Sequence, residues 1–194
     1  MQVIETELLD CYIIEPDRFG DSRGYFSPFY INNKFKELGF QGVTQASRSK
    51  SSKGVLRGLH YQENPKCQAK IVEVIKGSAY DVVVDLRKDS KTYKKWIKVL
   101  LTEDNNRQLY VPRGFAHGYL SLEDDTIFQY LIDNDYAPEL EGGIIYNDEE
   151  IGIDWETMFK ENDILEPILS DKDLNRKSLK ETKVDFRREA WSIL

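Results

Sequence analysis

The chain has 194 residues, and its 34 acidic and 27 basic residues give a formal net charge of −7 at pH 7. This charge excludes a general polyanion-binding surface, so we expect no nucleic-acid partner. Hydrophobic residues make up 40% of the chain, too many for disorder, and no run approaches the roughly 18 apolar residues of a membrane span. Cys11 and Cys67 indicate reduced thiols, and the acidic N-terminus around Glu5 is unlike a signal peptide. Composition therefore predicts a soluble cytoplasmic protein with no membrane partner.

The N-terminal part predicts a short extended segment and a short helix. Residues 12–14 (Tyr-Ile-Ile) form the extended segment. Asn32 or Asn33 is suited to cap a helix over 34–38, which would end at Gly39.

After Lys53 the hydrophobic pattern changes to a period of two, which predicts β-strands. Residues 71–75 and 79–84, joined by a turn at Gly77, are typical of a hairpin. The further β-rich runs are 96–101, 108–111, 118–122 and 127–132. Helical character returns only near the C-terminus, over 155–160 and 174–182. This order predicts a β-barrel or jelly roll with short helices at its ends.

We expect a single domain over residues 1–194. Its parts are an N-terminal arm with a short helix (1–50), a jelly-roll core (51–147) and a C-terminal helical segment (148–194). The last of these ends in an amphipathic stretch that includes Leu179, Phe186 and Trp191. We predict that this stretch packs on the barrel or on a second subunit.

Positive charge is concentrated in residues 48–70. This segment contains six basic residues and one acidic residue, Glu63, so its net charge is +5. The basic residues are Arg48, Lys50, Lys53, Arg57, Lys66 and Lys70. One interpretation is a solvated loop and strand edge. The other is a local site for a phosphate or diphosphate, which arginine binds in a bidentate manner.

The only two histidines, His60 and His117, both lie in apolar β-rich segments. Each is either a hydrogen-bonded core residue or a general base, since the ordinary imidazole pKa is about 6.5. Two imidazoles are too few for a three-histidine metal site, so we expect no metal ion.

Several motifs together resemble one family. Residues 112–117 (Pro-Arg-Gly-Phe-Ala-His) are similar to the second conserved motif of cupins. More narrowly, residues 1–175 resemble the dTDP-4-dehydrorhamnose 3,5-epimerase family, through motifs at 20–26, 55–62, 68–70, 80–87, 114–118, 146–148 and 169–173.

This resemblance implies a mainly β cupin jelly roll (a double-stranded β-helix) and an epimerase that needs no cofactor. The implied reaction inverts C3 and/or C5 of a nucleotide-linked 4-keto-6-deoxyhexose, by enolate formation and reprotonation from the opposite face. It also implies a homodimer that exchanges N-terminal strands, in which Arg23 reaches the neighbouring site.

The resemblance assigns four catalytic roles. His60 matches the base, and Asp173 matches the carboxylate that orients it. Lys70 matches the cation beside the enolate oxygen, and Tyr130 matches the proton donor on the far face. The implied substrate-binding residues are Arg23, Phe26, Gln45, Ser47, Arg57, His117, Tyr136 and Glu141.

Structural alternatives stay open for these residues. Tyr130 also suits a core aromatic residue, because Phe128 shares its strand face. Asp173 follows Ser170 by three, so it also suits a helix cap. Lys70 alternates with apolar residues, a placement that favours function because an unpaired buried lysine is costly.

Arg57 and His60 are an odd number of residues apart, so a regular strand would direct them to opposite faces. Both reach one pocket only if a bulge or a strand end intervenes, and Gly58 is the residue suited to it.

Pro28, Ser47 and Asp135 depart from the family pattern at positions associated with substrate binding. They keep two alternatives open: a single-carbon epimerase acting on a different nucleotide sugar, and a non-catalytic cupin that binds sugar nucleotides. A metal-dependent cupin oxygenase is a further alternative.

Overall fold

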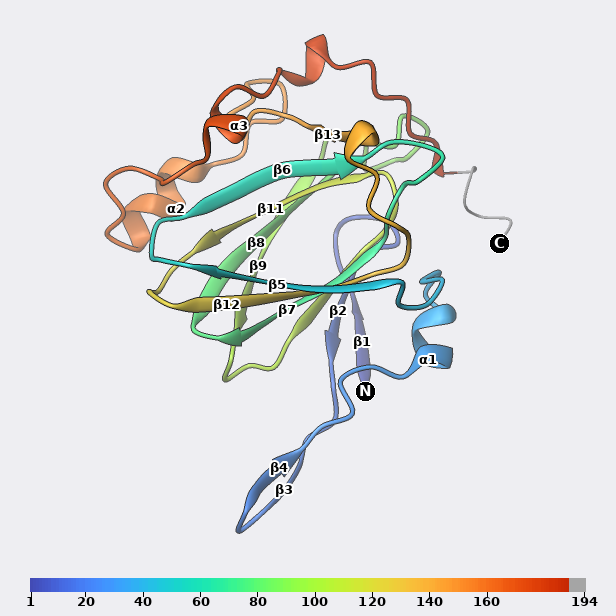
Figure 1. The fold of residues 1–194 in the computed structure, drawn as a ribbon, viewed down its shortest axis with the longest axis vertical. Coiled ribbons are helices and arrows are strands. Elements are labelled where there is room, and N and C mark those ends of the chain that lie inside the picture. The colour runs from blue at the N-terminus through green and yellow to red at the C-terminus, as the bar shows by residue number, and fades with distance from the viewer. Residues whose placement is uncertain (189–194) are drawn as a thin grey trace.

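The computed structural model describes residues 1–188 as two antiparallel sheets that face each other, with short helices outside them (Figure 1). The six-stranded sheet runs β1 (Gln2–Glu5), β2 (Tyr12–Glu15), β10 (Gln108–Val111), β7 (Lys70–Lys76), β12 (Thr126–Ile132) and β5 (Gln45–Ser51). The five-stranded sheet runs β13 (Glu141–Gly143), β6 (Leu56–Gln62), β11 (Phe115–Ser121), β8 (Ser78–Asp85) and β9 (Trp96–Thr102). The prediction of a mainly β jelly roll is confirmed.

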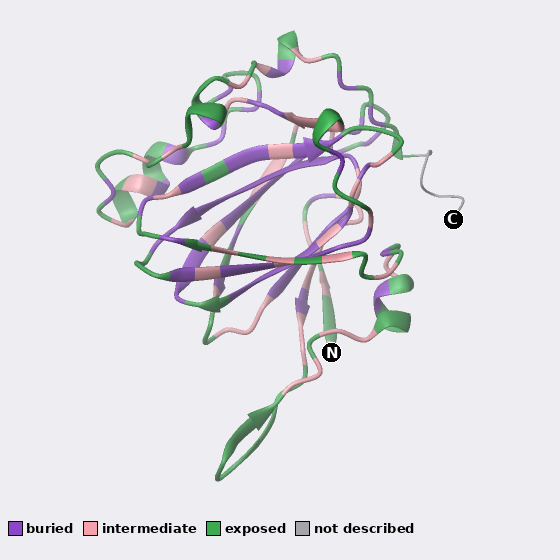
Figure 2. Cartoon of the chain, in the orientation of Figure 1, coloured by how far each residue is buried: buried purple, intermediate pink, exposed green. Residues whose placement is uncertain are grey.

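Three hydrophobic clusters fill the layers. The first lies between the sheets, where Val72 and Phe128 of one sheet meet Val83 of the other. The second covers the outer face of the five-stranded sheet, and the third covers the outer face of the six-stranded sheet. Strands such as β8 are therefore buried on both faces (Figure 2), which explains their near-continuous apolar runs.

The predicted hairpin of residues 71–84 is wrong, although both of its strands exist. β7 pairs with β10 and β12, whereas β8 pairs with β9 and β11 of the other sheet. The chain turns the corner at Gly77, whose φ is +79° and where a Cβ would lie 2.6 Å from Thr126 Oγ1. A turn signal between two apolar runs does not reveal that each strand takes its partners from distant segments.

The helices differ from the prediction in their ends. α1 (Asn32–Lys36) contains both asparagines, so neither caps it; its N-cap is Ile31, without a side-chain hydrogen bond. α2 (Trp155–Glu161) agrees closely with the prediction, and Asp154 caps it by accepting the Thr157 N–H.

The predicted helix over 174–182 is wrong. The segment contains only the end of α3 (Asp171–Leu174) and a 3-10 turn, η2 (Leu179–Glu181). The chain beyond is extended, with Phe186 buried and bridged to Arg87 on the barrel. Trp191 lies outside the described residues.

The N-terminal 50 residues do more than form an arm and a helix, because β1, β2 and β5 belong to the six-stranded sheet. Only β3 (Phe19–Asp21) and β4 (Gly24–Phe26) project from the body as a two-stranded hairpin (Figure 1). Every residue of these two strands is exposed (Figure 2). Across residues 1–188, no helix has the length and apolar character needed to cross a membrane.

Candidate active site

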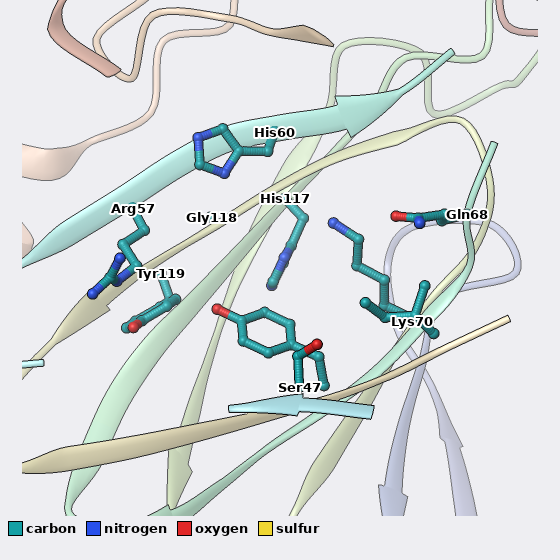
Figure 3. A pocket seen from close by; sticks show the side chains of 10 residues that line it. Ser47, Arg57, His60, Gln68, Lys70, His117, Gly118 and Tyr119 are labelled. Atoms are coloured by element: carbon teal, nitrogen blue, oxygen red, sulfur yellow. The ribbon is translucent and has the colours of Figure 1, made fainter. Parts of the chain in front are cut away.

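A cavity of about 220 Å³ lies between the two sheets (Figure 3). Strands β5, β7 and β12 of one sheet and β6 and β11 of the other supply its walls. The lining residues are Ser47, Arg57, His60, Gln68, Lys70, His117, Gly118, Tyr119, Tyr130 and Ile132. Six residues singled out in the sequence thus share one space, although they come from five strands.

A β-bulge in β6 allows Arg57 and His60 to line the same cavity. His60 pairs with His117 and Arg57 pairs with Tyr119, so three steps along β6 match two steps along β11. Gly58 has φ +131° within this bulge, and a Cβ there would lie 2.6 Å from the Cα of Gly118. The close backbone approach therefore requires glycine, and the bulge expected at this position is confirmed.

His60 is paired with Asp173, a residue 113 positions later in the chain. The His60 Nε2 and Asp173 Oδ1 atoms are 2.5 Å apart, with the imidazole 33% and the carboxylate 6% exposed. Burial acts to raise the pKa of Asp173, but hydrogen bonds and charge from His60 outweigh it and hold the pKa below its usual value. The bond to Nε2 fixes the ring and leaves Nδ1 as the proton acceptor.

The capping alternative for Asp173 holds only for its backbone. Ser170 is the N-cap of α3, and its side chain accepts the backbone N–H of Asp173 at 3.2 Å. The cap itself uses the backbone N–H of Asp173; the Ser170 side chain also acts to lower the pKa of the Asp173 carboxylate, which stays bonded to His60.

Lys70 extends into the cavity toward His117 (Figure 3). It stands at the end of β7, on the face that carries the buried residues Val72 and Val74. Burial lowers the pKa of Lys70, and the nearby negative charges of Asp81 and Glu141 act in the opposite direction. The ammonium group is thus held in a poorly hydrated position, where its interaction with a developing negative charge is strong.

Tyr130 lies on β12 and combines a packing role with access to the cavity. Its ring contacts Phe128 at 5.0 Å and meets the edge of His117 at 6.1 Å between centroids. Burial and the neighbouring Tyr119 raise the pKa of Tyr130, while a hydrogen bond with Ser49 acts to lower it. A protonated phenol therefore faces the cavity from the six-stranded sheet, opposite the strand that carries His60.

His117 forms a second histidine–carboxylate pair, with Asp81. His117 Nε2 and Asp81 Oδ1 are 2.6 Å apart, and both side chains are almost completely buried. Burial lowers the pKa of His117, although the Asp81 carboxylate opposes this effect. No role for Asp81 was predicted from the sequence. The feature that could have indicated one is a single carboxylate inside the apolar run 80–84, because a buried carboxylate needs a partner.

A second cavity of about 250 Å³ adjoins the first, because His60, Gln68 and Lys70 line both. Tyr136 and Glu141 stand in it, and the Tyr136 hydroxyl donates to Glu141 at 2.7 Å. Glu141 also pairs with Lys172 at 2.7 Å and with Arg176 at 2.6 Å. Burial acts to raise the pKa of Glu141, but these partners outweigh it and lower the pKa to about 2.

Three of the predicted binding residues lie outside both cavities. Gln45 is adjacent to the first one, where it donates to Ser47 Oγ at 2.9 Å. Arg23 and Phe26 stand on the projecting hairpin, and Arg23 pairs with its neighbour Asp21 at 2.5 Å. Within this chain, no residue of the hairpin lines either cavity, and the hairpin projects away from the two sheets (Figure 1).

The basic residues of the segment 48–70 take different positions in the fold. Arg57 and Lys70 line the cavity, whereas Lys50 pairs with Asp125 at 2.5 Å and Lys66 pairs with Asp135 at 2.8 Å. The surface interpretation therefore holds for Lys50 and Lys66, whereas Arg57 and Lys70 are available to a ligand in the cavity.

A paired imidazole, an ammonium group and a phenol around one cavity are the groups that an enolisation needs. The base removes a proton next to a carbonyl group, the cation stabilises the enolate oxygen, and the phenol returns a proton. The fold and the site together define a jelly-roll enzyme of proton transfer at carbon.

Comparison with known proteins identifies the family. The model of the dTDP-4-dehydrorhamnose 3,5-epimerase family matches residues 5–181. The epimerase of Shigella flexneri is 45% identical over 90% of this chain and 94% of its own. The chain therefore belongs to the dTDP-4-dehydrorhamnose 3,5-epimerase family, and it is an isomerase of the epimerase type.

Solved structures agree with this assignment. The epimerase of Mycobacterium tuberculosis superimposes with a TM-score of 0.91 at 35% identity, over 98% of this chain and 96% of that one. The epimerase of Elizabethkingia anophelis gives a TM-score of 0.87 at 44% identity, over 95% and 99% of the two chains. A structure from Legionella pneumophila, 38% identical, holds dTDP-4-keto-L-rhamnose.

Proposed function

We propose that this enzyme converts dTDP-4-dehydro-6-deoxy-D-glucose to dTDP-4-dehydro-L-rhamnose by inverting C3 and C5. The observation that carries the proposal is one cavity lined by His60, Lys70 and Tyr130, with Asp173 bonded to His60. The family membership supports the same reaction.

In the proposed mechanism, His60 removes the proton next to the C4 ketone. Asp173 holds the imidazole ring and stabilises the positive charge that forms on it. Lys70 stabilises the enolate oxygen, and its position in a poorly hydrated pocket strengthens this interaction. The site needs no cofactor, because the ketone itself makes the adjacent proton acidic.

Inversion requires that the new proton arrive on the face opposite the base. Tyr130 is the proposed donor, since it reaches the cavity from β12, whereas His60 reaches it from β6. The phenol hydrogen forms the new C–H bond, and a tyrosinate remains. His60 loses its proton to solvent, which restores the base.

Arg57 is the proposed ligand of the substrate diphosphate, because its exposed guanidinium group stands at the cavity wall. We also propose a homodimer in which the projecting hairpin covers the neighbouring subunit and brings Arg23 to its site. Exposed aromatic side chains on the hairpin support this: Phe19 (60%), Tyr25 (62%) and Phe26 (69%). A cytoplasmic location is proposed on the basis of the two free, buried cysteines.

A second candidate function is inversion of a single carbon, on a different nucleotide sugar. Ser47, one of the departures from the family pattern, lines the first cavity, and Asp135, another, directly precedes Tyr136, which lines the second. A 3′-monoepimerase of Streptomyces bikiniensis is 30% identical over 97% of this chain, with a TM-score of 0.86.

One incubation in deuterated water tests both functions. The dTDP, UDP, CDP and GDP forms of 4-keto-6-deoxyglucose are each mixed with the enzyme, and NMR follows deuterium and stereochemistry at C3 and C5. Deuterium at both carbons of the dTDP sugar, with the L-rhamno product, is the expected result. Deuterium at C3 alone would establish the second function. Binding without exchange for every nucleotide would contradict both and identify a non-catalytic sugar-nucleotide cupin.

A further inference from the structure

Arg176 follows the short helix α3 and connects two carboxylates. Its Nη2 atom donates to Glu141 Oε1 at 2.6 Å, and its Nε atom is 3.9 Å from Asp173 Oδ1. The Arg176 side chain is 12% exposed, compared with 6% for Asp173 and 17% for Glu141, so water screens these charges only weakly. The Asp173 oxygen that Arg176 approaches is the same Oδ1 atom that bonds to His60.

The backbone of β13 leaves room for this arginine. Both α3 and β13 lie beside β6 (Figure 1), and Gly143 of β13 pairs with His60 of β6. A Cβ at Gly143 would lie 2.8 Å from Arg176 Nε and 3.0 Å from Arg176 Cδ. Residues directly opposite each other in an antiparallel pair share a face, so Arg176 packs over Gly143 on the face that carries His60. The missing side chain at Gly143 therefore lets the guanidinium group approach the His60–Asp173 pair.

Arg176 differs in position from the cations that line the cavities. It lines neither the first cavity nor the second, so it does not face a substrate bound there. Its Nε–H is buried and has no hydrogen-bond partner among residues 1–188. A guanidinium group only donates and is always charged. At 3.9 Å, this part of Arg176 acts on Asp173 through its charge and not through a hydrogen bond.

A general base must be unprotonated before it can accept a proton from carbon. The Asp173 carboxylate, 2.5 Å from His60 Nε2, acts against this, because a negative neighbour favours the charged imidazolium. A positive charge beside the carboxylate reduces this effect, and Arg176 supplies one. Burial acts to raise the pKa of Asp173, and the charge of Arg176 is among the contributions that lower it.

We propose that Arg176 is a positioning residue for the reaction: it shares the charge of Asp173 with His60 and keeps the His60 imidazole unprotonated at neutral pH. Glu141 holds the guanidinium group in place through its hydrogen bond. The inference rests on the proposed function, in which His60 is the base. Removal of the positive charge should therefore favour the imidazolium and leave less of the base at a given pH.

Other charged and titratable groups also surround His60. Lys172, on α3, pairs with Glu141 at 2.7 Å but is 60% exposed, so water screens its charge more strongly. The groups on the cavity walls are Arg57, Lys70, His117, Tyr130, Tyr136 and Glu141. All of them are kept in the variants below, so a difference between variants reports on Arg176.

NMR titration of the imidazole groups measures the effect directly, since the chain has only two histidines. His60→Asn identifies the signal of His60 by its absence. In Arg176→Gln, the titration midpoint of His60 should rise by about 0.5–1 pH unit. Arg176→Lys keeps the charge and should restore at least half of this change.

Lys177→Gln is the matched control, because it removes an exposed positive charge at the next residue. Its midpoint should stay within about 0.2 pH unit of the wild type. If Arg176→Gln is poorly folded, Arg176→Met and Arg176→Lys provide a second comparison, between a neutral and a charged unbranched side chain.

The pH dependence of kcat/KM gives the functional readout. The acid limb of the profile in Arg176→Gln should move to higher pH by the same amount as the midpoint. The value of kcat/KM should then fall about threefold to tenfold below pH 6 and by less than about twofold at pH 9. Arg176→Lys should return the profile toward that of the wild type.

A midpoint and an acid limb that move to lower pH would show that the carboxylate has left His60, and this would overturn the proposal. An unchanged midpoint, or an equal loss of kcat/KM at every pH, would also overturn it and assign Arg176 a structural role. An inactive wild-type enzyme would instead contradict the proposed function itself, because the NMR titration needs no activity.

Discussion

The two histidine–carboxylate pairs have nearly the same geometry and opposite surroundings. His60 and Asp173 are 2.5 Å apart, and His117 and Asp81 are 2.6 Å apart. Both imidazoles line the cavity, but that of His60 is 33% exposed and that of His117 is only 4% exposed. A carboxylate partner alone therefore does not distinguish a base from a structural histidine.

Burial determines what each pair can do. Desolvation lowers the pKa of His117, so this imidazole stays neutral and serves as a fixed hydrogen-bond donor to Asp81. Asp81 Oδ2 has no hydrogen-bond partner among the described residues, so His117 is important for compensating this buried carboxylate. His60 instead lines the cavity with its imidazole partly exposed, and the proposed mechanism uses it as the base. We therefore expect loss of activity at one pair and loss of stability at the other.

The largest expected effect is on catalysis at the exposed pair. His60→Asn removes the base, so kcat for epimerisation should fall by a factor of about 10²–10⁴. The free energy of unfolding should fall by no more than about 1–2 kcal/mol, less than at the buried pair, because the Asp173 carboxylate loses its partner at a site where the imidazole is 33% exposed. Steady-state assays and urea denaturation measure the two quantities. A large loss of stability with retained kcat would reverse the comparison.

The second effect is on stability at the buried pair. His117→Ala leaves the Asp81 carboxylate without its partner, which should cost about 3 kcal/mol of unfolding free energy. Urea denaturation of this variant beside Asp81→Asn checks the origin of the loss. If the buried carboxylate is the cause, the double variant should be more stable than His117→Ala alone. Additive losses would contradict this explanation.

The third effect is a pH-dependent contribution of the His60–Asp173 pair to stability. The folded-state pKa of Asp173 is below its usual value, so its contribution to stability is complete above the ordinary carboxyl pKa of about 3.9. This contribution is lost as pH falls through that value toward the lower folded pKa. Asp173→Asn should therefore cost about 1–2 kcal/mol at pH 7 and much less at pH 3.

The matched control for this measurement is Asp171→Asn, because Asp171 is an exposed carboxylate on the same short helix. Its unfolding free energy should differ from the wild type by the same amount at both pH values. If the loss of unfolding free energy in Asp173→Asn were larger at pH 3 than at pH 7, the lowered pKa of Asp173 would not be its cause.

The smallest effect on stability is expected at the projecting hairpin, far from both pairs. Phe26→Ser removes an exposed aromatic side chain, so the unfolding free energy of the subunit should change by less than about 0.5 kcal/mol. Light scattering should nevertheless show a shift from dimer to monomer, and KM should rise. An unchanged dimer would contradict the proposed role of the hairpin.

Local patterns in the sequence predicted most strands correctly but not their partners. The hydrophobic period of two located β7 and β8. No local sequence feature, however, showed that the chain passes from one sheet to the other at Gly77. The helix expected over 174–182 failed because its two leucines do not share a buried helical face: Leu174 is 50% exposed, whereas Leu179 is buried from a 3-10 turn. Tertiary packing outweighed local propensity there.

The site was predictable only in part from residues alone. The odd spacing of Arg57 and His60 required a bulge, and Gly58 supplied it. In contrast, spacing could not connect His60 with Asp173 across 113 residues; only the family resemblance did so. Tyr119 was missed because an aromatic residue in an apolar strand gives no signal that it lines a cavity.

The central claim is that His60 and Tyr130 act on opposite faces of one bound keto sugar. The most direct measurement compares deuterium exchange with epimerisation in Tyr130→Phe and in His60→Asn. The account predicts that Tyr130→Phe still exchanges substrate hydrogen with solvent while inverted product falls strongly, and that His60→Asn loses both. Equal loss of exchange and inversion in Tyr130→Phe, or exchange that persists in His60→Asn, would contradict it.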